Sequence, residues 1–184
     1  MNYKALKISL LCILQLGLFS FYQSSYINWQ ENQFLTFENF KAKAPKGDKT
    51  AASIYTEISW VKKQTRQELP VYTVINRMDE NRSWINRKDE NLLNQKQLQF
   101  DISEFYTRKI RQEIQLLMQK KVRDEAAYKE VFTRHSIQLQ RVQKKYLNLL
   151  SDQPYLWKII NKEYQDSLIL YKDFSHSVSY THLT

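Results

Sequence analysis

The amino-acid sequence predicts an α+β fold, in which antiparallel strands come first and three long helices follow. Apolar and polar residues alternate in two stretches before residue 80, which is the period of half-buried strands. From residue 92 to residue 171 the apolar residues instead recur every three or four positions, which is the period of amphipathic helices. The 184 residues, 42% of them hydrophobic, suffice for one domain with a modest core.

Met1–Ser25 is predicted to be a signal peptide or, if it is not cleaved, an N-terminal anchor. Lys4 and Lys7 precede an apolar core of fourteen residues, Ile8–Phe21. This length matches the ~7–15 residues of a signal-peptide core and is shorter than the ~17–25 of a membrane-spanning helix. We therefore expect an exported protein, periplasmic or extracellular, that contacts the inner membrane only through this segment if the segment is retained.

Two strands are expected to form an antiparallel pair. Ala51–Val61 alternates apolar with polar side chains, and Pro70–Met78 does the same after a polar connection. Asp79–Glu90 is polar and is predicted to be a loop, interrupted by Ser83–Ile85. The strand pair should therefore end shortly before the helical half of the chain begins.

Three helices are expected in the second half of the chain, at Leu92–Lys121, Asp124–Leu150 and Pro154–Tyr171. Each carries apolar residues along one face, and Pro154 is well suited to a first helical turn. Strands and helices together define one expected domain over residues 26–177. Residues 178–184 (VSYTHLT) follow no periodicity and resemble one reading frame of a transposon-end sequencing adapter, so we expect them to be a non-native tail.

The charge distribution disfavours a nucleic-acid partner. The net charge is +9, but the basic residues alternate with acidic ones, as in Arg77–Arg82 and Lys120–Glu125. Such interleaving is typical of a solvated surface, and no nucleic-acid-binding motif is present. Only two glycines occur, which disfavours a phosphate-binding loop. Cys12 is the only cysteine, so an intrachain disulfide and a thiolate zinc site in the domain are excluded.

The first helix carries two amide side chains at the spacing of a metal-ligand pair. Gln95 and Gln99 are one helical turn apart and point the same way. An amide oxygen is a neutral ligand that suits calcium better than zinc. Lys96 lies between them, and its positive charge opposes a nearby divalent cation. On these residues alone, the helix is better explained as one that never bound a metal, with Gln95 and Gln99 as ordinary polar positions.

The same helix resembles a family of exported bacterial proteins, domain of unknown function nine-two-two, which are predicted zinc-dependent proteases of the zincin class. The family helix reads roughly Leu-Leu-Asn-His-Glu-Gln-x-His-Phe-Asp-Ile-x-Glu-x-Tyr-x-Arg-Lys, and Leu92–Lys109 reads LLNQKQLQFDISEFYTRK here. The resemblance covers about Phe34–Tyr171. It includes Leu35–Phe40, Ala51–Ala52, Tyr55–Thr56, Ile58 and Ser83–Trp84. It implies a zincin-like α+β fold.

The resemblance also implies that the catalytic positions have changed. In the family helix the two histidines bind zinc and the glutamate activates the zinc-bound water. Here Gln95 and Gln99 stand at the histidine positions and Lys96 at the glutamate position, so we expect no zinc and no other cofactor. A later family segment, Tyr-Asp-x-Glu-Thr-x-His, aligns by spacing so that its histidine falls on Asp152, and a rival alignment places His135 there instead.

Three functions are compatible with these observations. The first is a catalytically inactive zincin-like protein that binds a peptide, a protein partner or an envelope polymer, with the strand pair offering an edge to an extended peptide. The second is an active hydrolase with a non-standard site built from Asp101, Glu104, His135 or Asp152. The third is a basic, envelope-associated structural protein that binds anionic lipid or glycan. The sequence indicates neither a substrate nor an oligomeric state.

Overall fold

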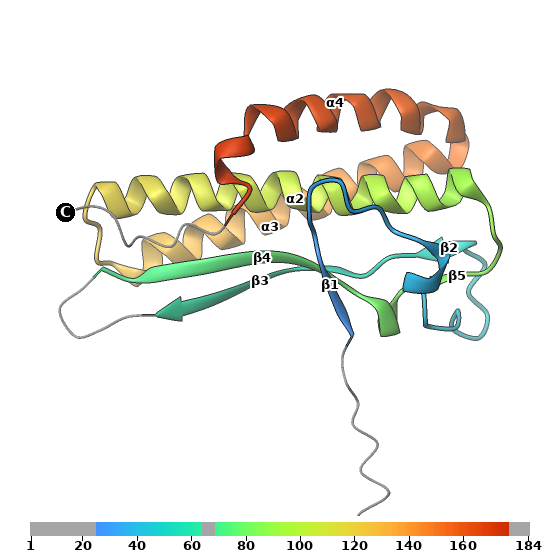
Figure 1. The fold of residues 1–184 in the computed structure, drawn as a ribbon, viewed down its shortest axis with the longest axis horizontal. Helices are drawn as coiled ribbons and strands as arrows, with labels where there is room; N and C mark the ends of the chain where they lie inside the picture. Colours follow the sequence, from blue (N-terminus) through green and yellow to red (C-terminus); the bar gives the residue numbers. More distant parts are fainter. Residues whose placement is uncertain (1–24, 64–68, 177–184) are drawn as a thin grey trace, which may run out of the picture.

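The structure is a computed structural model that describes residues 25–63 and 69–176. It confirms the α+β class, with a small antiparallel sheet followed by three helices. Figure 1 shows the central helix running along the sheet, with a second helix beside it and a third on the side away from the sheet. The segment up to residue 24, where a signal was predicted, and the predicted tail at 178–184 lie outside the described residues. Among the described helices, none has both the length and the apolar character that a membrane span requires.

The described strands form a three-stranded and a two-stranded antiparallel sheet, in the orders β1-β4-β3 and β2-β5. Their bounds are β1 Tyr26–Asn28, β2 Ala52–Ser53, β3 Thr56–Lys63, β4 Val71–Asp79 and β5 Trp84–Ile85. The central strand β4 pairs with β3 along its whole length but with β1 only at its last residues, with Met78 opposite Ile27. The predicted antiparallel pair is thus confirmed, while the edge of β4 beyond β1 lacks a strand partner in the described chain.

The prediction of one continuous strand over Ala51–Val61 is wrong, because the chain divides into β2 and β3 at Ile54 and Tyr55. The Tyr55 backbone N–H donates to Ser83 Oγ (2.9 Å), and that hydroxyl donates to the Asp79 carbonyl (2.7 Å). The Ser83 hydroxyl therefore replaces the direct backbone hydrogen bond that would join the Tyr55 N–H to the Asp79 carbonyl. The residues before Ile54 leave β4 and pair with β5 instead. The predicted loop at Asp79–Glu90 accordingly contains a short strand as well as a 3-10 turn.

The three helices begin and end close to the predicted positions. They are α2 (Glu90–Gln119), α3 (Glu125–Asp152) and α4 (Trp157–Leu170), and the 3-10 turns are η2 (Phe37–Asn39), η3 (Glu80–Arg82), η4 (Pro154–Leu156) and η5 (Lys172–Phe174). Asp89 and Asp124 accept backbone N–H groups at the starts of α2 and α3, which explains both starts. The third helix is shorter than predicted, because Pro154 opens η4 and the α-helix begins only at Trp157.

Helix α2 is the centre of the described structure. It packs against β4, α3 and α4, and contributes to each of the three buried apolar clusters. Ile110 packs under β4, Ile102 faces α3 and α4, and Phe100 joins the cluster that contains Leu35 and Met78. Because α2 is covered on several sides, many of its polar residues are buried as well, and buried polar groups need partners within the protein.

Candidate functional site

The motif positions lie on the first half of α2. Gln99 and Lys96 are buried, with 8% and 5% of their surfaces exposed, and Gln95 is partly exposed. Burial lowers the pKa of Lys96 from 10.5 to about 8, and no opposite charge offsets that burial. Among the described residues no carboxylate pairs with the Lys96 ammonium. The position that carries a general base in the zincin-type helix therefore holds a buried, uncompensated cation.

These side chains do not fit a zinc ion. Gln95 and Gln99 offer neutral amide oxygens where zinc prefers imidazole or thiolate, and Lys96 adds a positive charge between them. Within residues 25–63 and 69–176, no group of three His, Cys, Asp or Glu side chains is arranged to hold a metal ion. We therefore derive no metal-assisted step from this helix.

The two residues proposed as the further ligand lie elsewhere. His135 is buried on α3, where Nε2 is 2.7 Å from Glu113 Oε1 and Nδ1 is 3.1 Å from Gln138 Oε1. Glu113 follows Gln99 by fourteen residues on α2, or about 21 Å along a helix axis, so His135 cannot join the motif positions. Asp152 ends α3 with an exposed side chain.

Asp101, a candidate for the non-standard hydrolase, is buried and held by three donors. Trp29 Nε1 (2.8 Å) and Gln97 Nε2 (2.9 Å) donate to Oδ1, and Gln165 Nε2 (2.9 Å) donates to Oδ2. Burial raises the pKa of Asp101, although these hydrogen bonds and the charge of Arg108 oppose the rise. The donors come from a loop, α2 and α4, so this carboxylate joins three parts of the chain.

Glu104 is buried too, and it is paired with two arginines on the same helix. Its Oε1 lies 3.2 Å from Arg108 Nε and 2.8 Å from Arg111 Nη1. Burial raises the pKa of Glu104, and the two guanidinium groups oppose that rise. Asp101 and Glu104 lie three residues apart, but each has its own donors and neither is a surface pair. The two carboxylates therefore have separate sets of partners: Glu104 accepts from the two arginines, and Asp101 accepts from Trp29, Gln97 and Gln165.

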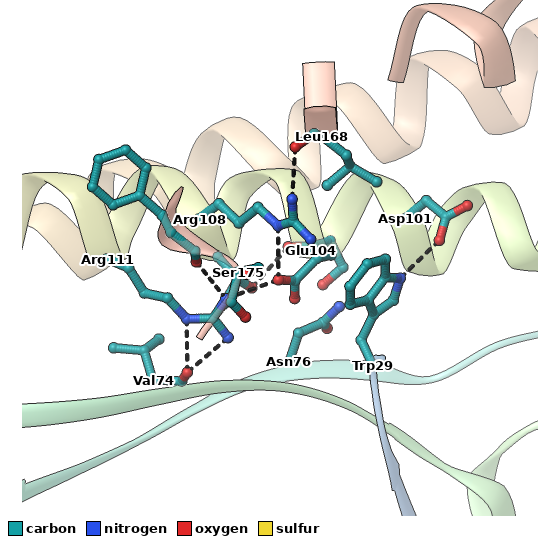
Figure 2. Close-up of polar contacts among 12 residues, drawn as sticks. Trp29, Val74, Asn76, Asp101, Glu104, Arg108, Arg111, Leu168 and Ser175 are labelled. Atoms are coloured by element: carbon teal, nitrogen blue, oxygen red, sulfur yellow. Dashed lines mark hydrogen bonds and ion pairs between the residues drawn. The ribbon is translucent and has the colours of Figure 1, made fainter. Parts of the chain in front are cut away.

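Arg111 connects this helix to the sheet edge and to the last described turn. Its Nε and Nη2 donate to the Val74 carbonyl of β4 (3.0 and 2.9 Å), on the edge that β1 leaves open. Its Nη1 donates to the carbonyls of Phe174 and Ser175 (2.9 and 3.0 Å). Figure 2 shows the guanidinium group between these carbonyls and Glu104. The contacts fasten α2, β4 and η5 together.

Arg108 points to the other side of the same cluster. Its Nη1 donates to the Leu168 carbonyl of α4 (2.6 Å), and its guanidinium carbon lies 5.0 Å from the centre of the Trp29 ring. Its Nη2 is buried and has no hydrogen-bond partner among the described residues. Arg108 is one of the residues that line a cleft of about 170 Å³ between the Trp29–Phe34 loop, α2 and α4.

Part of this cluster has a signal in the sequence. Arg108 and Arg111 follow Glu104 by four and seven residues, spacings at which side chains on one helix face meet. Trp29 and Gln165 carry no such signal, because they lie 72 and 64 residues from Asp101 in the chain. Only the tertiary structure assembles them.

No family model, curated protein or solved structure matches this chain. The resemblance to domain of unknown function nine-two-two accordingly rests on the residues of Leu92–Lys109 and of the segments before it.

Proposed function

We propose that this protein is an exported, zincin-like protein that has no catalytic activity and acts by binding an extended peptide or an unfolded segment of a partner protein. The observation that carries the proposal is Lys96, a buried cation at the position where a zincin-type helix has its general base. With amides on both sides of it, at Gln95 and Gln99, this helix offers neither zinc ligands nor a carboxylate base.

The neighbouring residues that match the family pattern support a retained scaffold. Gln97 Oε1 accepts the Leu35 backbone N–H (2.8 Å) while its amide donates to Asp101. The Phe100 carbonyl accepts from the side chain of Asn76 on β4 (3.2 Å). These contacts tie α2 to the loop and sheet around it, so these residues have a structural role that does not depend on catalysis.

The edge of β3 is a suitable surface for an extended peptide. In the described sheet β3 has a strand partner only on its β4 side. The Val74 and Asn76 carbonyls of β4 accept from Arg111 and Trp29 on the side opposite β3. The residues of β3 opposite Asn76, Val74 and Tyr72 therefore direct their N–H groups outward, where a peptide backbone can pair with them. They are Ile58, Trp60 and Lys62.

A hydrolase based on Asp101 and Glu104 has less support. A general base must be free to take a proton from a water or substrate. Asp101 is fixed by three donors and Glu104 by two guanidinium groups, and neither side chain is more than 2% exposed. Both carboxylates are better explained as parts of the buried polar cluster.

Metal content and hydrolysis together test the loss of catalysis. The purified protein, equilibrated with zinc and desalted, is expected to retain no stoichiometric zinc by mass spectrometry and to cleave neither casein nor a fluorescent peptide library. Stoichiometric zinc together with chelator-sensitive cleavage would overturn the proposal.

A display library of random peptides tests the binding part. Selected peptides should bind the parent protein and the Lys62→Ala variant equally, because alanine keeps the outward N–H of residue 62 and removes the side chain that pairs with Glu125. Lys62→Pro should lose binding, because proline removes an outward N–H from the β3 edge. Equal binding by the proline variant would exclude the β3 edge as the binding surface.

A further inference from the structure

The cleft beside Arg108 has the features of a built site for a small ligand. Its volume of about 170 Å³ far exceeds the ~15 Å³ that one water needs. One wall is the Trp29–Phe34 loop, another is α2 with Asp101 and Arg108, and the third is α4 with Gln165 and Ile169. Polar groups line its inner end and two apolar side chains lie at its rim.

Arg108 supplies an unused donor at the inner end. The side chain is only 2% exposed, and Nε and Nη1 already donate to Glu104 and to the Leu168 carbonyl. The Trp29 ring covers one side of the guanidinium group, and Figure 2 shows Nη2 on the side that faces Trp29 and Asp101. A buried cationic N–H without an acceptor is unfavourable, so this nitrogen is suited to an anionic oxygen from outside the chain.

Asp101 and Gln165 supply the remaining polar groups. The Asp101 carboxylate accepts three hydrogen bonds, and a carboxylate has about four acceptor positions, so it can accept one further N–H. Gln165 donates one N–H to Asp101, which leaves its amide oxygen and its second N–H for a ligand. The inner end therefore offers both a cationic donor and an anionic acceptor.

The rim is apolar and exposed. Phe34 and Ile169 line the cleft from its loop and helix sides, and 72% and 66% of their surfaces are exposed. Large apolar side chains exposed together at a cleft mark a binding surface more often than an ordinary surface. A ligand for this cleft thus has a polar end for Arg108 and Asp101 and an apolar part for the rim.

We infer that the cleft binds the carboxylate of an apolar amino-acid residue. The carboxylate lies on Arg108 Nη2, the N–H of the α-nitrogen lies on Asp101, and the side chain lies between Phe34 and Ile169. This inference goes beyond the proposed peptide-binding edge of β3, because the cleft is a separate surface formed by the Trp29–Phe34 loop, α2 and α4. Two sources carry the same chemistry, the last residue of a peptide and a free amino acid. The charges of the buried residues Asp101, Glu104, Arg108 and Arg111 cancel, and Glu31 of the loop adds one negative charge to the lining of the cleft.

Titration calorimetry of the full chain with three probes tests the inference. N-acetyl-leucine carries the carboxylate and an amide N–H, leucine carries the carboxylate and an ammonium, and N-acetyl-leucinamide lacks the carboxylate. At least one of the two acids should bind about tenfold more tightly than the carboxamide, because the carboxamide offers no anionic oxygen to the Arg108 guanidinium group. Tighter binding of N-acetyl-leucine identifies a peptide terminus, and tighter binding of leucine identifies a free amino acid. Absence of acid binding at millimolar concentration, or equal binding of the carboxamide, overturns the inference.

A matched pair of rim variants locates the site without disturbing the buried cluster. Ile169→Asp puts a negative charge at the rim and should weaken binding of the acid by about tenfold. Leu170→Asp adds the same charge one residue away, on a side chain that is 79% exposed and does not line the cleft, and should change binding by less than about twofold. Equal effects of the two variants would overturn the assignment.

Arg108→Lys keeps the charge but removes the planar donor group, and should lose the acid if circular dichroism shows it folded. If it does not fold, the rim pair still decides the question. The Lys62→Pro variant acts on β3 and should bind the acid normally. Absence of acid binding by the parent protein thus contradicts this inference alone, whereas zinc-dependent cleavage contradicts the proposed function.

Discussion

Replacing Arg111 by methionine should be among the most destabilising single changes at a charged residue of this protein. Its guanidinium group donates to the Val74 carbonyl through two nitrogens, to the Phe174 and Ser175 carbonyls, and to Glu104. Methionine fills much of the same volume but supplies no donor. The variant therefore leaves a buried β4 carbonyl and a buried carboxylate short of partners.

The magnitude follows from the burial of the pair. Arg111 is 7% exposed and Glu104 1% exposed, so water does not replace the lost contacts. Removing one partner of a buried ion pair typically costs ~3–5 kcal/mol. Arg108 remains bonded to Glu104, which favours the lower end, while the lost bonds to three carbonyls favour the upper end. We expect Arg111→Met to lower the free energy of unfolding by ~3–5 kcal/mol.

Urea denaturation followed by circular dichroism measures this change, and Arg87→Met is the matched control. Arg87 pairs with Asp89 at 3.2 Å, but 68% of its side chain is exposed, so its loss should change stability by less than ~1 kcal/mol. If Arg111→Met lost no more stability than Arg87→Met, the buried cluster would not hold α2, β4 and η5 together, and our explanation of it would be wrong.

Three further predictions concern residues of α2. Gln95→His, Lys96→Glu and Gln99→His combined should gain zinc affinity in a zinc titration, and a folded triple variant without any affinity would show that this helix lacks metalloprotease geometry. Lys96→Met should stabilise the protein by up to ~3 kcal/mol at pH 7, because burial lowers the Lys96 pKa from 10.5 to about 8. Between pH 8 and 10 Lys96 is protonated in the unfolded chain but neutral in the folded protein, so the stability of the parent should rise with pH relative to that of Lys96→Met. Urea midpoints of the two proteins that differ by the same amount at every pH would refute this. The pKa of Glu113 is lowered, because hydrogen bonds from Arg134 and His135 outweigh its burial, so its stabilisation is full above pH 4.5 and is lost at lower pH. Glu113→Gln should accordingly have a lower melting temperature than the parent at pH 7. If the same difference in melting temperature persisted at pH 3, the stabilisation would not come from the ionised Glu113 carboxylate.

The sequence by itself determined the class of fold and the helices with good accuracy. Strand period, helix period and capping aspartates are local properties, so β4, α2 and α3 begin and end within about two residues of their predicted bounds. The sequence also identified Gln95, Lys96 and Gln99 as poor zinc-site residues, because that conclusion depends only on residue type and helical spacing. Export and family membership stay predictions.

Only the tertiary structure decided where polar groups meet. Ser83 interrupts the first predicted strand by bonding to Tyr55, 28 residues away, and no local pattern encodes that contact. Asp101 and Glu104 are charged residues of an amphipathic helix, yet both are buried because a sheet, a loop and α4 close around them. A periodic pattern records which side of an element is apolar, whereas the partner of a buried charge depends on distant segments that pack together.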